Sequence, residues 1–205
     1  MTAVSAPDGD LVPLHRRSIE YQVTLDGDDL VVVGRLVDSR PWAEDGSFVA
    51  RVHDIELRVR VRSSDLTIVG ATAVMHTYPH TECPGIEAAF AGLEGLSVAR
   101  GYTREIGVRF GGPRGCTHLE HLARSLGPVV IQAVTSRRAL AVSRGEAEDL
   151  VSGAGASGSP WARDSCHIWA EGGIADQKLA AGWHPGVGPY PSPALVTFRT
   201  GSTGS

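Results

Sequence analysis

Residues 53–62 read His-Asp-Ile-Glu-Leu-Arg-Val-Arg-Val-Arg, and from Ile55 onward apolar and charged side chains alternate without a break. Successive side chains of a β-strand point to opposite faces, so this stretch predicts a strand with one buried and one solvated face. A polar turn at residues 63–65 follows, and the mainly apolar residues 66–74 predict a return strand. The hairpin formed by these strands decides the fold class.

The chain before this hairpin predicts a second one. Residues 19–24 alternate in the same way, and residues 30–37 form a mostly apolar run. Asp26-Gly27-Asp28-Asp29 lies between them and predicts a tight turn. Residues 39–49 are expected to form a loop between the hairpins. We therefore expect an antiparallel sheet over residues 17–75.

The hydrophobic period changes after the sheet. A helix is predicted to begin at Cys83, because apolar residues recur at helical spacing at Ile86, Phe90 and Leu93. Another is predicted to begin at Thr117, whose capping-box partner is Glu120, with apolar positions Leu119, Leu122 and Leu126. Gly127-Pro128 is expected to break or kink it before a further helical stretch over 129–142. Strands followed by helices predict an α+β fold, an antiparallel sheet with helices packed on one face.

Composition divides the chain into five predicted segments. We expect a disordered lead at 1–13, an α+β core domain at 14–150 and a flexible linker at 151–160, which is rich in Gly, Ala and Ser. A C-terminal appendage with a Cys-His motif is expected at 161–190, and a mobile tail at 191–205.

The composition also limits the classes of function that are possible. The 205 residues are 42% hydrophobic and 20% charged, as in ordinary globular proteins. The net charge of −4 argues against a broad surface for nucleic acid or anionic membranes. No apolar run has the length of a membrane-spanning helix, and residues 1–10 lack the pattern of a signal peptide. We therefore expect a cytoplasmic protein whose partner is a small-molecule substrate, and the oligomeric state stays open.

The three cysteines lie among other reactive residues. Cys83 follows His80 and Glu82, Cys116 precedes a Thr-His-Leu-Glu-His run, and Cys166 stands next to His167. Thiolates and imidazoles bind soft metals and act as nucleophiles and bases, so these clusters are the predicted functional residues. The alternative is that the cysteines are small buried hydrophobic residues.

Several side chains are candidates for one site. Cys83 and Cys116 each come where a helix is predicted to begin, and helix N-termini favour the thiolate form. His118 and His121 are three positions apart and can share a helix face, with solvent exposure the alternative for His121. The remaining candidates are Asp54 and His53, as ligands or an acid–base pair, Arg114, as an anion-binding residue after a Gly-rich loop, and Cys166 with His167.

Taken together, the motifs His53-Asp54-x-x-x-Arg58, Tyr78-Pro79-x-x-x-Cys83, Gly115-Cys116-Thr-His-Leu119 and Asp164-x-Cys166-His167 resemble an uncharacterised bacterial domain-of-unknown-function family. His15-Arg16-Arg17 and Asp38-x-x-Pro41 fit the same family, over about residues 13–190. The chain is more distantly similar to the iron–sulfur scaffold fold of the NifU/IscU type. That resemblance implies a site made of Asp54, Cys83 and Cys116. The scaffold's first cysteine falls at Val52, so His53, His118 or Cys166 would complete the ligand set.

These observations lead to three functional hypotheses. The first is a small-molecule enzyme whose zinc or iron ion acts as a Lewis acid in hydrolase, lyase or cyclisation chemistry. Its candidate ligands are Cys83, Cys116, Asp54, His53, His118, His121, Cys166 and His167, and its candidate catalytic residues are Cys116, His118, Asp54 and Arg114. The second is an iron–sulfur or sulfur-transfer scaffold. The third is a metal-free enzyme with Cys116 as nucleophile and His118 or His121 as base.

Overall fold

The structure, a computed structural model, describes residues 11–146, 163–183 and 191–200. The chain divides between Val130 and Ile131 into two compact units, which we call the N-terminal and C-terminal units. Among the described residues, no helix combines the length and apolarity needed to cross a membrane. The predicted linker at 151–160 and the predicted domain end at 150 lie outside the described residues.

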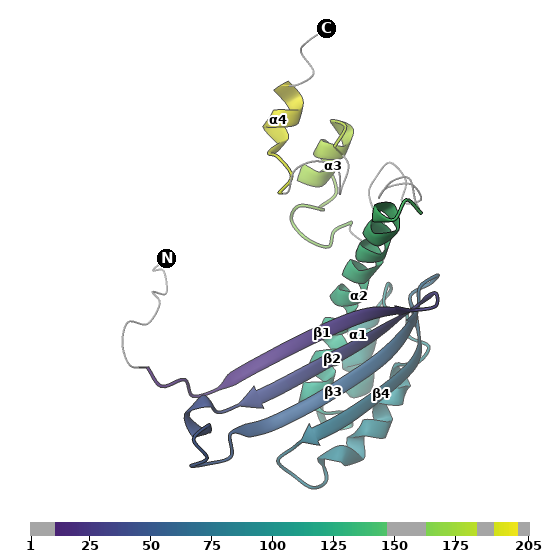
Figure 1. The fold of residues 1–205 in the computed structure, drawn as a ribbon. Coiled ribbons are helices and arrows are strands. Elements are labelled where there is room, and N and C mark those ends of the chain that lie inside the picture. The colour runs from purple at the N-terminus through teal and green to yellow at the C-terminus, as the bar shows by residue number, and fades with distance from the viewer. Residues whose placement is uncertain (1–10, 147–162, 184–190, 201–205) are drawn as a thin grey trace. The chain divides into compact units, whose positions relative to one another are not determined.

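Four strands form one antiparallel sheet in the order of the sequence (Figure 1). They are β1 (Arg16–Asp26), β2 (Asp29–Ser39), β3 (Arg51–Arg62) and β4 (Thr67–Thr77). Gly27 has a φ of 61°, the left-handed conformation that the two-residue turn between β1 and β2 requires. The predicted sheet and its first hairpin are confirmed.

The helical elements of the N-terminal unit follow the sheet, and α1 lies behind it in Figure 1. The N-terminal unit contains the 3₁₀ helix η2 (Cys83–Leu93), the helix α1 (Tyr102–Phe110), the short 3₁₀ turn η3 (Gly112–Arg114) and the start of α2 (Thr117–Ser143). A 3₁₀ turn η1 (Pro41–Ala43) interrupts the loop between β2 and β3. The α+β class with helices after an antiparallel sheet is confirmed.

The core lies between one face of the sheet and the helices. Ile55, Leu57, Val59 and Val61 of β3 are fully buried, as their alternation predicts. Leu119, Leu122 and Leu126 of α2 are also fully buried and occupy one helix face. Burial of each such side chain contributes roughly 1.5–3 kcal/mol, so this layer fixes α2 on the sheet.

Three details differ from the sequence predictions. The segment that begins at Cys83 is a 3₁₀ helix, not an α-helix. The helix α2 continues through Pro128, so of the predicted break or kink the break does not occur. The ring of Pro128 is exposed, while Leu126 and Val130 on either side are buried and hold the helix in place. The helix α1 was not predicted from the sequence.

In the C-terminal unit the described residues include α3 (Ile174–Ala180) and α4 (Leu195–Thr200). The indole rings of Trp169 and Trp183 lie 6.5 Å apart between centroids, and Lys178 lies 5.7 Å from the centroid of the Trp183 ring. The helix α4 falls in the tail that was predicted to be mobile.

Candidate functional site

Asp38 is the centre of a cluster of charged and polar side chains in the N-terminal unit. Its side chain is only 2% exposed. Arg17 donates to both carboxylate oxygens, from Nε to Oδ1 and from Nη2 to Oδ2, each at 2.7 Å. Nε2 of His15 lies 3.0 Å from Oδ1, and Nδ1 of His53 lies 3.1 Å from Oδ2. A buried carboxylate requires such partners, because burial without them would be very costly.

The strand register explains why these residues meet. Arg17 of β1 pairs with Asp38 of β2, and Asp38 pairs with His53 of β3. Directly opposed residues of antiparallel strands point to the same face, which here is the face covered by the helices. The register shifts between Asp38 and Ser39, so the ladder is irregular just beyond the site.

The first turn of α2 adds His118 to the cluster. Its Nε2 lies 3.4 Å from Oδ2 of Asp38, and its ring centroid lies 3.9 Å from that of His53. Burial lowers the pKa of His118, and the neighbouring His53 lowers it further, against the opposing effect of Asp38. The lowered pKa favours a neutral imidazole, the form that accepts a proton or binds a metal.

Asp38 stays ionised beside it. Burial acts to raise the pKa of the Asp38 carboxyl, but the hydrogen bonds and charges of Arg17 and His15 outweigh burial and lower the pKa to about 2. At neutral pH the cluster therefore combines a carboxylate, a guanidinium and imidazoles.

Cys116 lies next to His118, immediately before α2. Its Sγ is 3.7 Å from Nδ1 of His118, and its side chain is half-buried. The backbone oxygen of Cys116 accepts a hydrogen bond from the Glu120 amide at 2.8 Å, the first helical bond of α2. Cys116 thus occupies the cap position that was predicted for Thr117. The capping-box prediction is wrong, since the Glu120 carboxylate instead binds Arg124, at 2.8 Å from its Nη2.

His118 therefore links a thiol to a buried carboxylate. Its Nδ1 faces Cys116, and its Nε2 faces Asp38. Among the residues that the structure describes, one set of three or more potential metal ligands lies together, namely Asp38, His53 and His118, with ligand atoms within 4.8 Å of one another. The arrangement suits either a thiol–imidazole–carboxylate relay or a metal centre of two imidazoles and a carboxylate.

The other predicted carboxylate, Asp54, belongs to the opposite face of the sheet. It follows His53 on β3, and consecutive strand residues point to opposite faces. Its carboxylate accepts hydrogen bonds from Arg35 at 2.7 Å and from Arg51 at 2.9 Å. The hydrogen bond from Arg35 is the main reason why the pKa of Asp54 is lowered. In this structure Asp54 is the centre of an ion-pair cluster and does not join Asp38.

Among the described residues, the other predicted site residues form no hydrogen bond or ion pair with Asp38. Cys83 is half-buried at the start of η2 and belongs to no group of three potential ligands among the described residues. The guanidinium of Arg114 donates to the backbone oxygens of Val108 and Gly107, at the end of α1. The His121 side chain is exposed on α2. In the C-terminal unit, Cys166 and His167 are both exposed.

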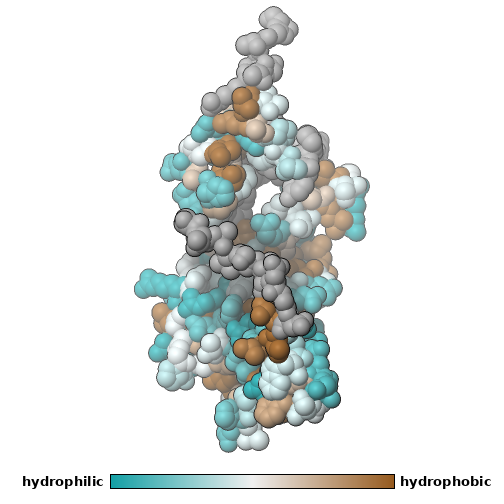
Figure 2. Space-filling model, turned by 90° about the vertical axis from the view of Figure 1, so that its left-hand side faces the viewer, coloured by the Kyte–Doolittle hydropathy of each residue, from teal (hydrophilic) through white to brown (hydrophobic). Residues whose placement is uncertain are grey.

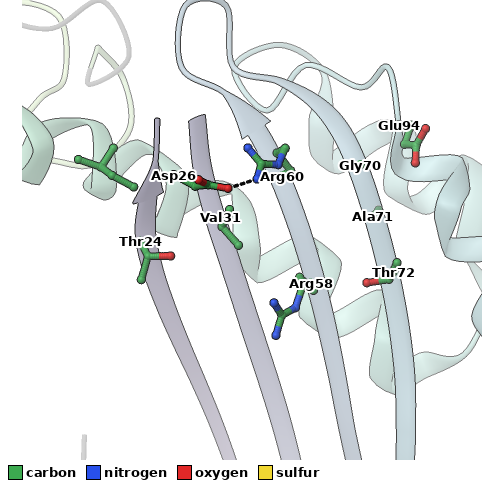
Figure 3. Close-up of a pocket in the computed structure, with 10 residues that line it drawn as sticks. Thr24, Asp26, Val31, Arg58, Arg60, Gly70, Ala71, Thr72 and Glu94 are labelled. Atoms are coloured by element: carbon green, nitrogen blue, oxygen red, sulfur yellow. Dashed lines mark hydrogen bonds and ion pairs between the residues drawn. The ribbon is translucent and has the colours of Figure 1, made fainter. Parts of the chain in front are cut away.

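A second polar region contains none of the predicted site residues. It is a depression of about 550 Å³ at the β1–β2 turn end of the sheet, and Figure 3 shows the side chains around it. Arg60 in its wall forms ion pairs with Asp26 and Asp29, and Arg58 lies 3.6 Å from Glu56. Its arginines are thus already paired with carboxylates.

Sequence reasoning missed Asp38, Arg17 and His15 as site residues. These residues stand in the motifs His15-Arg16-Arg17 and Asp38-x-x-Pro41, which the sequence analysis noted only as part of a family resemblance. Their meeting depends on the pairing of β1 with β2, which no local pattern reveals.

Comparison with known proteins shows the family of the chain. No curated protein and no solved structure matches the chain. The similarity to the iron–sulfur scaffold fold therefore stays a prediction. A family model described as a protein of unknown function (DUF2889) matches residues 15–132, which begin at His15 and include all of the Asp38 cluster. This match covers more than half of the 205 residues, and the chain belongs to the DUF2889 family.

Proposed function

We propose that this protein is an enzyme that acts on a small molecule through a thiol nucleophile, Cys116, with His118 as base and Asp38 as the residue that orients His118. The observation that carries the proposal is the position of His118. One ring nitrogen lies 3.7 Å from the Cys116 sulfur and the other lies 3.4 Å from the Asp38 carboxylate. Nucleophile, base and orienting group follow one another as a thiol-based catalyst requires.

The position of Cys116 supports its role as nucleophile. It precedes the first turn of the 27-residue helix α2. Unpaired backbone N–H groups and the helix dipole at this end attract negative charge. The side chain is half-buried rather than enclosed, so a small molecule has a route to the sulfur.

The reaction class that suits these groups is hydrolysis or transfer of an acyl group. His118 takes the thiol proton, and the sulfur forms a bond to the carbonyl carbon of the substrate. The leaving group departs with the proton from His118. Water, deprotonated by His118, then cleaves the thioester, and the thiol is restored. Proton transfer by a positioned imidazole contributes about 10²–10⁴-fold to such reactions.

The surroundings of the site favour a substrate with an apolar portion. Chain segments that carry site residues continue into exposed apolar side chains at the same end of the sheet. Leu14 precedes His15, and Trp42 and Phe48 lie in the loop between Asp38 and His53. Figure 2 views the molecule from the side where this end lies and includes brown hydrophobic patches among hydrophilic surface.

A metal centre is the second candidate, since Asp38, His53 and His118 place three ligand atoms within 4.8 Å of one another. Zinc bonds to nitrogen and oxygen of about 2.0–2.2 Å require ligand atoms at such spacing, and zinc or iron would act there as a Lewis acid. The position of Arg17 weighs against this candidate. Its guanidinium donates to the oxygen of Asp38 that faces both imidazoles, and its charge opposes a cation there.

The test measures alkylation of Cys116 by iodoacetamide in a background where Cys83 and Cys166 are replaced by serine. Intact mass at successive times gives the rate at pH 7. His118→Gln should slow alkylation about tenfold or more, because the base that generates the thiolate is lost. The matched control is His121→Gln on the same helix, whose side chain is exposed and which should leave the rate within about twofold.

A second measurement separates the two candidates. Equilibrium dialysis against zinc gives the metal content of the protein and of His53→Gln. For a thiol enzyme, neither binds zinc stoichiometrically, and His53→Gln alkylates nearly as fast as the parent. One zinc per chain, lost in His53→Gln, favours the metal centre. Equal alkylation rates in the parent, His118→Gln and His121→Gln would rule out the thiol mechanism.

A further inference from the structure

The two outer strands of the sheet, β4 and β1, differ in whether another segment of the chain covers their outer edge. The segment after η2 covers the outer edge of β4 where that strand begins. The Ile68 amide donates to Leu96, the Gly95 amide donates to Ile68, and the Val98 amide donates to Leu66, each at 2.9 Å. The outer edge of β1 has no such cover among the described residues, where β1 pairs only with β2.

The strand β1 also lacks two of the features that prevent edge pairing, a proline and a bulge. It has eleven residues without proline or glycine, and its ladder with β2 has no irregularity, whereas both other ladders contain register shifts. A long, regular edge strand offers a row of unpaired N–H and C=O groups to another strand. Its core-facing residues Ile19, Tyr21 and Val23 are only half-buried, and Leu25 is 43% exposed. A neighbouring strand would complete their burial.

We propose that β1 pairs antiparallel with β1 of a second copy of this chain, around a two-fold axis at Tyr21. The sequence of β1, Arg-Arg-Ser-Ile-Glu-Tyr-Gln-Val-Thr-Leu-Asp, is complementary to its own reverse in this register. Arg16 faces Asp26 of the other copy, and Ile19 faces Val23. The inner pairs are Ser18 with Thr24 and Glu20 with Gln22, and Arg17, which is bound to Asp38 of its own chain, faces Leu25. Opposite charges and apolar groups directly across a ladder stabilise such pairing.

Alternative registers are poorer. Moving the axis to Glu20 places two Glu20 carboxylates opposite each other and leaves Asp26 unpaired, and like charges directly opposite are destabilising. Moving it to Gln22 leaves Arg16 without a partner. A shift by one residue would turn apolar side chains toward the polar face. The axis at Tyr21 uses all eleven residues of the strand.

The side chain at the axis leaves room for this pairing. The Tyr21 hydroxyl donates to the backbone oxygen of Leu122 at 2.7 Å, on the helix side of the sheet. Its ring lies over Gly34 of the neighbouring strand β2, so close that a Cβ on Gly34 would be 2.5 Å from the ring. The ring therefore leans inward from the edge, and two such rings do not compete for the axis.

The end pairs join existing ion pairs. Arg16 lies 3.6 Å from Glu44, and Asp26 pairs with Arg60 in its own chain. The two side chains of the new contact, Arg16 and Asp26, are well exposed, at 62% and 63%. These exposed end charges provide substitutions that alter the contact and leave the core intact.

The experiment compares oligomeric state by sedimentation velocity over a concentration series of the full chain. The parent should form dimers. Arg16→Glu and Asp26→Arg should each weaken the dimer by about tenfold or more, because each places two like-charged pairs at the interface. An equimolar mixture of the two variants should recover dimers. In the mixed dimer the introduced glutamate faces the introduced arginine, and the native Arg16 of one copy faces the native Asp26 of the other. The double variant should recover dimers alone.

The matched control is Arg104→Glu, which changes the charge by the same amount at an exposed position on α1. It should dimerise like the parent. Circular dichroism of every variant checks that the sheet is retained. A parent that stays monomeric at all concentrations would overturn the proposal. Dimers that Arg16→Glu and Asp26→Arg leave unchanged, or that mixing does not restore, would overturn it equally.

Discussion

Replacing Asp38 by asparagine should remove about 2 kcal/mol of stability at pH 7. Hydrogen bonds and charges from Arg17 and His15 lower the pKa of the Asp38 carboxyl from its ordinary value of 3.8 to about 2. A shift of one unit corresponds to about 1.4 kcal/mol, so the whole shift corresponds to roughly 2.4 kcal/mol. Arg17 is partly exposed, so solvent screening makes this figure an upper bound.

The lowered pKa of Asp38 also determines how the loss of stability in Asp38→Asn depends on pH. A carboxyl whose pKa is lower in the folded state contributes stability that is fully present above the unfolded pKa. That contribution is lost as the pH falls through the folded pKa, here between about pH 4 and pH 2. The asparagine of the variant cannot ionise, so the stability difference between parent and variant should be retained from pH 7 down to about pH 4. Below about pH 4 the difference should shrink.

Urea unfolding followed by circular dichroism at several pH values measures both quantities. Asp54→Asn is the control for replacing a buried carboxyl outside the Asp38 cluster. The pKa of Asp54 is also lowered, through Arg35 on the other face of the sheet. Two results would refute the reasoning. One is an Asp38→Asn variant whose free energy of unfolding at pH 7 lies within about 0.5 kcal/mol of that of the parent. The other is a difference that stays constant down to about pH 2.

Three further predictions concern packing and metal binding. Gly34→Ala should destabilise the fold by about 1–3 kcal/mol, because the new Cβ would clash with the Tyr21 ring. Gly70→Ala is the control, since the nearest atom to its new Cβ lies at 3.9 Å, and it should lower the melting temperature less. Leu122→Ala should cost about 2–5 kcal/mol in urea unfolding, because the side chain is fully buried; Leu140→Ala, at a position 39% exposed, is the control, and equal losses would contradict the packing described above. If the thiol mechanism holds, zinc in tenfold excess should leave the melting temperature within about 1 °C, whereas specific binding to the native state would raise it.

The fold could be predicted from the sequence to a useful extent, because its strands carry their own pattern. The alternation from Ile55 to Arg62 predicted a half-buried strand, and the structure buries its aliphatic residues completely. The helix α1 was missed, since it has only nine residues and three buried positions, Tyr102, Ile106 and Phe110. So short a helix is held by packing rather than by a long local signal.

The candidate site was predicted in part. Cys116 and His118 lie two positions apart, so their contact is local and the sequence indicated it. Asp38 was missed because its contacts depend on strand register, and Asp54 was grouped with His53 because the two are neighbours in sequence. The alternation that predicted the strand already placed His53 and Asp54 on opposite faces. If the two-residue alternation had been applied to the candidate site as well as to the core, it would have assigned His53 and Asp54 to different clusters.

The pairing of Arg17, Asp38 and His53 across three strands has a consequence for the order of folding. These three groups come together as neighbouring hairpins form, which requires only contacts that are near in sequence and therefore fast. His118 and Cys116 arrive only when α2 docks on the finished sheet, a contact between distant parts of the chain. A sheet without its docked helix would already contain the carboxylate and its arginine but no nucleophile. The proposed thiol chemistry would therefore require the docked helix, and chains in which α2 has not docked would be inert.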